Sequence, residues 1–139
     1  MQYLFQWSFN PPERPTALHR ELQAFFRTIA EDKIEEDPNY YSFAEELIYG
    51  VLDNVDEVDE VVKRYAKNWD FNRIARIDLA ILRLAIYEMM ERRDIPPIVS
   101  INEAIDLSKE YSNPDAKRFI NGILDQYKLT LDRPLRTAE

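Results

Sequence analysis

The sequence contains no cysteine, one histidine and two glycines among its 139 residues. Without cysteine, disulfide bonds, thiolate zinc sites and cysteine nucleophiles are excluded. The single histidine, His19, rules out a metal site built from several histidines, and its amphipathic helical surroundings favour an ordinary helix residue. Two isolated glycines, Gly50 and Gly122, cannot form a glycine-rich loop that cradles a phosphate. These absences disfavour most metal-dependent and nucleotide-dependent enzymes.

Long apolar runs are absent as well. No stretch of about 18 apolar residues occurs, so no membrane span is expected. The start, MQYLFQWSFNPPE, has neither a basic leader nor a small-residue cleavage site, so a cytoplasmic location is expected. The net charge of −8 repels nucleic acid at long range, so RNA binding would require a local basic patch or a basic partner.

Prolines divide the remaining sequence into segments with helical spacing of apolar residues. Because strand-like alternation is not sustained anywhere, we predict an all-α fold in a single domain over residues 1–139. Its approximate halves are 1–68 and 69–130, and residues 131–139 are expected to form a frayed tail. Segment 71–92 is apolar on most of its circumference, which predicts a central helix buried between neighbours.

Residues 100–127 carry two helix-start signals. Ser100 and Glu103 form the S-x-x-E pattern of a capping box, which predicts that a helix begins at Ser100. Asn113 is a good N-cap, and Pro114 suits the first position of the next helix. Gly122 falls inside that second helix, where glycine costs about 1 kcal/mol relative to alanine. We therefore expect Gly122 to allow close packing of a neighbouring helix.

Basic and aromatic residues interleave in the second half of the chain. The basic residues are Lys63, Arg64, Lys67, Arg73 and Arg76, and the aromatic residues are Tyr65, Trp69, Tyr111 and Phe119. Cations together with stackable rings suit single-stranded RNA, although a solvated helix face is the alternative. No residues combine as nucleophile, base and oxyanion site. We therefore expect a binding protein that has neither enzymatic activity nor a cofactor or metal.

The blocks LRLAIYEM, INEAIDLSK and FINGILD follow one another within residues 69–125. In this order and spacing they resemble the NusB family of bacterial transcription antitermination factors. MQYLFQWSF and FAEELIYGVLDNVDEVD extend the resemblance over nearly the whole chain. It implies two packed three-helix subdomains around a central helix, and a non-enzymatic role. It also implies binding of boxA RNA together with NusE, a ribosomal small-subunit protein. The complex would join other antitermination factors on RNA polymerase, chiefly at ribosomal RNA operons.

The resemblance also implies site residues. The residues implied for RNA contact are Arg83, Asp115, Arg118 and Phe119, with the neighbouring Lys117 adding positive charge. Those for NusE contact are Phe5, Phe9 and Asp78. Arginine can contact phosphate and phenylalanine can stack on a base. The alternatives are core packing for Phe119, and pairing or capping at the edge of the core for Arg83 and Asp78.

The chain departs from the family pattern at its start, where an arginine-rich stretch has no match. Either the chain begins downstream of that stretch or its RNA binding is weaker than usual. The alternative function is therefore a protein-interaction module of the same fold with weakened or lost RNA binding. A shortened first helix would also leave apolar residues for a second copy of the chain, namely Met1, Tyr3, Leu4 and Phe5.

Overall fold

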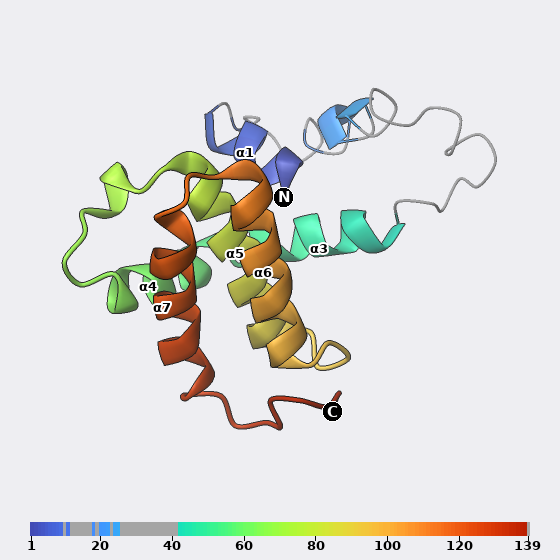
Figure 1. Cartoon of the computed structure of the whole chain (residues 1–139). Helices are drawn as coiled ribbons and strands as arrows, with labels where there is room; N and C mark the ends of the chain where they lie inside the picture. Colours follow the sequence, from blue (N-terminus) through green and yellow to red (C-terminus); the bar gives the residue numbers. More distant parts are fainter. Residues whose placement is uncertain (10, 12–17, 19, 23, 26–41, 139) are drawn as a thin grey trace.

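The computed structural model describes residues 1–9, 11, 18, 20–22, 24–25 and 42–138 (Figure 1). The helices are α1 (Gln2–Phe9), α3 (Ser42–Asp53), α4 (Val55–Tyr65), α5 (Arg76–Glu91), α6 (Pro97–Tyr111) and α7 (Ala116–Lys128), with a short 3₁₀ helix, η1 (Phe71–Arg73). This part of the chain contains no strand, which confirms the all-α prediction. His19 lies outside the described residues.

Helix α5 is the centre of the fold. It packs against α1, α3, α4, α6 and α7. Its apolar residues cover most of its circumference, and Ile81, Leu82 and Ile86 are fully buried. The predicted central helix is therefore confirmed, although residues 71–75 form η1 and a turn ahead of it.

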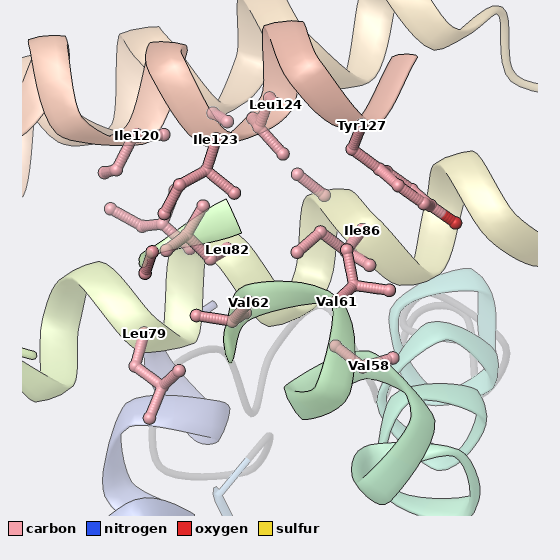
Figure 2. Packing of buried hydrophobic residues seen from close by; sticks show 14 of the residues in the cluster. Val58, Val61, Val62, Leu79, Leu82, Ile86, Ile120, Ile123, Leu124 and Tyr127 are labelled. Atoms are coloured by element: carbon pink, nitrogen blue, oxygen red, sulfur yellow. The ribbon is translucent and has the colours of Figure 1, made fainter. Parts of the chain in front are cut away.

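Two hydrophobic clusters meet on α5. The larger cluster joins α4, α5, α6 and α7. Figure 2 shows its packing between α4, α5 and α7 at Val58, Val62, Leu82, Ile120 and Leu124. The smaller cluster contains Tyr3, Leu4, Leu22, Ile48, Val51 and Ala80. Helix α4 thus shares its core with the C-terminal helices, because its valines face α5 and α7. Tyr3 and Leu4 are each 1% exposed, so they supply no intermolecular surface, and the homodimer stays a prediction.

The two predicted helix starts have different outcomes. Helix α6 begins at Pro97, so the prediction that Ser100 is its N-cap was wrong. Proline suits the first helical position, which starts the helix one turn earlier and places Ser100 inside it. The second prediction is confirmed for the capping hydrogen bonds of Asn113 but not for the first residue, because Asp115 and not Asn113 directly precedes α7. The Asn113 side-chain oxygen accepts from the N–H groups of Asp115 and Ala116, both at 3.1 Å, and α7 begins at Ala116.

The two glycines occupy opposite environments. A β-carbon at Gly50 in α3 would overlap the hydroxyl end of the Tyr87 ring, so this glycine permits the close approach of α5. A β-carbon at Gly122 would meet nothing within 4 Å in the described part of the chain. The prediction that Gly122 permits close helix packing was therefore wrong. Glycine inside a helix costs about 1 kcal/mol relative to alanine, and at residue 122 no packing contact requires it.

The frayed tail over residues 131–139 stays a prediction, but one residue in it is tied to the fold. The Arg133 guanidinium donates to the carbonyl oxygens of Arg92 at 3.1 Å, Arg93 at 3.0 Å and Ile95 at 2.8 Å. These carbonyls lie at and just beyond the end of α5, where helical partners run out. The segment is thereby tied across the turn between α5 and α6.

Candidate nucleic-acid interface

An aromatic pair, Trp69 and Phe119, brings together two segments that are distant in sequence. The ring centroids lie 5.2 Å apart with an interplanar angle of 57°. Trp69 is 60% exposed, whereas Phe119 is half-buried and packs against the larger core cluster. Phe119 is therefore anchored on the core and still keeps exposed surface beside Trp69.

Local hydrogen bonds position Trp69 in the turn between α4 and η1. The Ala66 N–H donates to the Val62 carbonyl at 2.8 Å and ends α4. The Trp69 N–H then donates to the Ala66 carbonyl at 3.0 Å. The Asp70 side chain accepts from the Asn72 N–H at 3.0 Å and starts η1. These bonds hold the turn that presents the indole toward α7.

A groove of about 610 Å³, here called the Phe119 groove, runs along this pair. Its lining residues are Trp69, Arg73, Ile74, Ala75, Asp78, Asn113, Pro114, Asp115, Ala116, Arg118 and Phe119. The structure thus brings together three of the residues implied for RNA contact: Asp115, Arg118 and Phe119. Lys117 is exposed on α7 next to them but does not line the groove.

The basic groups at and beside this groove, Arg73, Lys117 and Arg118, are open to solvent. In the described part of the chain, neither Lys117 nor Arg118 forms an ion pair. Arg73 is only loosely paired, at 3.9 Å from Asp70, and its side chain is 85% exposed. Cations without partners beside exposed aromatic surface can contact phosphates while a base stacks on a ring.

Asp78 lies at the Phe119 groove and not with Phe5 and Phe9, the other two residues implied for partner contact. It is 7% exposed, and its carboxylate accepts a short hydrogen bond from the Ser112 hydroxyl. Asp78 stands in the first turn of α5, and Ser112 directly follows α6. The contact therefore joins the start of α5 to the end of α6.

Phe5 and Phe9 border a second groove of about 650 Å³, here called the Phe5 groove. It is lined by Met1, Gln2, Phe5, Phe9, Ile74, Ala75, Arg76, Ile77 and Tyr111. The rings of Phe5 and Phe9 meet edge to face at 5.0 Å, and Phe9 is 60% exposed. The Arg76 guanidinium lies 4.6 Å from the Phe9 ring centroid. Ile74 and Ala75 line both grooves, so the two surfaces adjoin.

Arg83 lines neither groove. Its guanidinium donates to both carboxylate oxygens of Asp59, at 2.8 and 2.9 Å, and ties α5 to α4. The two side chains are 8% and 15% exposed, and the Trp7 ring centroid lies 5.6 Å from the guanidinium. The structure therefore does not bring Arg83 together with Phe119. This geometry matches the alternative of an ion pair at the edge of the core, and we leave Arg83 out of the interface.

The site residues implied by the family resemblance do not include Trp69 and Arg73, an aromatic and a basic side chain that also line the Phe119 groove. Both belong to the interleaved basic and aromatic set of the sequence, so a signal for them existed. That pattern does not say which ring reaches α7, because the answer depends on the turn that follows α4.

Other chemistry in the described ranges is limited. They contain no group of three or more carboxylate or histidine side chains that could hold a metal ion, and no helix in them is long and apolar enough to cross a membrane. Burial raises the pKa of the Glu88 carboxyl, and this effect outweighs the opposing effects of the neighbouring Ser100 side chain and Arg92. Glu88 lines a separate groove with Phe43 and Val99, away from the aromatic pair.

Comparison with known proteins identifies the family. The family model described as "NusB family" matches residues 1–128. The chain belongs to the NusB family. The resemblance carried by LRLAIYEM, INEAIDLSK and FINGILD is thereby confirmed.

Individual NusB relatives agree with this assignment. The Transcription antitermination protein NusB of Myxococcus xanthus is 40% identical over 122 residues, which cover 88% of this chain and 87% of the relative. Among solved structures, T. maritima NusB has a TM-score of 0.74 and 32% identity, covering 99% of this chain and 87% of that one. A chain in the crystal structure of a plectonemic RNA supercoil has a TM-score of 0.71 and 25% identity, covering 91% of this chain and 86% of that one.

Proposed function

We propose that this NusB-family chain is a transcription antitermination factor that binds boxA-type RNA at the Phe119 groove together with NusE at the Phe5 groove. The observation that carries the proposal is the pair of the exposed Trp69 and the half-buried Phe119, next to Arg118, which forms no ion pair within the described residues. The name of its relatives and the RNA in one structurally similar crystal support the same function.

In this proposal, the side chains at the edge of α7 make several kinds of contact with RNA. Bases stack on the exposed parts of Phe119 and Trp69, and Arg118 and Lys117 contact phosphates. The Asp115 carboxylate accepts hydrogen bonds from base amino groups. Because the net charge of the chain is −8, its affinity for RNA alone is low, and a partner that brings positive charge increases it.

NusE occupies the Phe5 groove in this proposal. The exposed Phe9 ring and the adjoining Phe5 ring supply apolar surface of the kind that protein interfaces bury. Asp78 exposes little surface, so the two phenylalanines carry most of this contact. Since the grooves adjoin at Ile74 and Ala75, one partner can lie beside the bound RNA. The complex then joins other antitermination factors on RNA polymerase, chiefly at ribosomal RNA operons.

Fluorescence anisotropy with labelled RNA tests the proposal. We expect weak binding of boxA RNA by the chain alone, and tighter binding that depends more steeply on salt when NusE is added. A scrambled RNA of the same composition should bind more weakly in the presence of NusE. Equal affinity for the two RNAs under that condition would overturn the proposal.

A double variant separates RNA binding from partner binding. Arg118→Ala with Phe119→Ala should weaken RNA binding and leave NusE binding intact, because neither residue lines the Phe5 groove. Unchanged RNA affinity in this variant would instead support the alternative, a NusE-binding module without an RNA site at α7.

A further inference from the structure

Gly122 has no structural explanation within the fold. It lies inside α7, one helical turn beyond Arg118 and Phe119. No glycine in the described residues has a positive φ, so a special backbone conformation does not require it. A β-carbon there would meet no atom within 4 Å in the described part of the chain, so helix packing does not require it either.

Gly122 instead lines a third groove of about 290 Å³, here called the Gly122 groove. Trp69, Arg118 and Phe119 line both this groove and the Phe119 groove. The aromatic pair and its arginine therefore stand between two adjoining hollows. An RNA strand with a base stacked on the aromatic pair in one groove can therefore place its next nucleotide in the other groove.

The remaining polar lining of the Gly122 groove suits a nucleotide. Lys67 is an exposed cation in the turn after α4, where it can contact a phosphate. The side-chain amides of Asn68 and Gln126 each offer donors and an acceptor, which match the edges of an unpaired base. Cation, amide and aromatic groups together describe a subsite for one nucleotide of single-stranded RNA.

We propose that the Gly122 groove is a second nucleotide subsite, and that Gly122 keeps it open so that a nucleotide rests directly on the backbone of α7. This inference rests on the proposed RNA-binding function and adds a specific position to it. The missing side chain is the binding feature: any β-carbon at residue 122 would project into the space that the nucleotide occupies.

Substitutions of increasing size at residue 122 test the inference, with fluorescein-labelled boxA RNA and saturating NusE. Gly122→Ala should raise the melting temperature by about 4 °C, because alanine is the better helix former. It should also weaken RNA binding by roughly fivefold, and Gly122→Leu by roughly 50-fold, within the range for losing one stacked base. Neither variant removes a charge, so the slope of log affinity against log salt should stay unchanged.

Asn102→Ala is the matched control, because Asn102 is an exposed residue of α6 that lines none of the three grooves. It should raise the melting temperature slightly without changing RNA affinity. Wild-type affinity in both Gly122 variants would overturn the subsite. Phe119→Ala distinguishes a failure of the subsite from a failure of the proposed function. If Phe119→Ala weakens RNA binding while the Gly122 variants do not, only the subsite is overturned. If Phe119→Ala also has no effect, the proposed function fails.

Discussion

The molecule contains two groups that each combine an arginine, a carboxylate and an aromatic ring. The two groups differ in exposure and in whether the arginine is paired. The interior group consists of Arg83, Asp59 and Trp7, and the edge group consists of Arg118, Asp115 and Phe119. In the interior group, the paired arginine and aspartate side chains are 8% and 15% exposed. In the edge group, Arg118 is exposed and, within the described ranges, has no ion-pair partner.

The comparison shows that residue type alone does not assign a role. Two charges inside a fold must satisfy each other, and Arg83 and Asp59 do so with two short hydrogen bonds that hold α4 against α5. An arginine on the surface keeps its donors available to a ligand. The interior group therefore stabilises the fold, whereas the edge group is free to bind.

Removing the interior arginine should have the largest effect. Arg83→Ala leaves the Asp59 carboxylate, whose side chain is 15% exposed, without its partner, so the free energy of unfolding should fall by about 2–4 kcal/mol. Urea denaturation followed by circular dichroism measures this change. The double variant Arg83→Met with Asp59→Leu should recover most of the loss, because no unpaired charge remains. A loss below about 1 kcal/mol in Arg83→Ala would contradict the assignment of Arg83 to the core.

Removing the edge arginine should affect binding and leave folding intact. Arg118→Ala should weaken binding of boxA RNA in the presence of NusE by about 1–2 kcal/mol and reduce the salt slope by about one. Its free energy of unfolding should stay within about 0.5 kcal/mol of the wild type. Lys109→Ala removes the same charge from an exposed position of α6 outside both grooves, and should leave RNA affinity unchanged. Equal weakening by the two variants would indicate a general charge effect.

The two glycines extend the comparison between interior and edge. Gly50→Ala should reduce the free energy of unfolding by about 1–2 kcal/mol, because the Tyr87 ring must move away from the new methyl group. Gly122→Ala should increase it by about 1 kcal/mol, since the added methyl group meets open space. Denaturant titrations of both variants check the opposite signs. Destabilisation by Gly122→Ala would show that α7 is more tightly packed at this position than the structure indicates.

The smallest effect concerns the half-buried Glu88 carboxyl on α5. Burial raises the pKa of Glu88 above its ordinary value of 4.5, so the folded state binds a proton more tightly than the unfolded state. Stability is therefore lost as pH rises from 4.5 through the higher folded-state pKa. Glu88→Gln should lack this loss, so the variant should be the more stable protein at neutral pH. Well below pH 4.5, where the Glu88 carboxyl is protonated in both states, the two proteins should agree in thermal denaturation.

Some features followed from the sequence because they depend on local rules. The apolar circumference of residues 71–92 predicted the central helix, and the Asn113 cap signal predicted the start of α7. The family blocks predicted the fold. The prediction for α6 failed because two local signals compete there, and Pro97 begins the helix before the Ser100 capping pattern can.

By itself, the sequence determined the helical class, the central helix and the family, because periodicity and motif order are properties of the chain. Only the tertiary structure decided the surroundings of individual residues. The sequence alone does not distinguish Arg83 from Arg118, but in the folded chain Arg83 is buried and Arg118 is exposed. Trp69 meets Phe119, and Gly122 faces open space, because of how α4, η1 and α7 pack together. Such relations join residues far apart in sequence, and no local pattern encodes them.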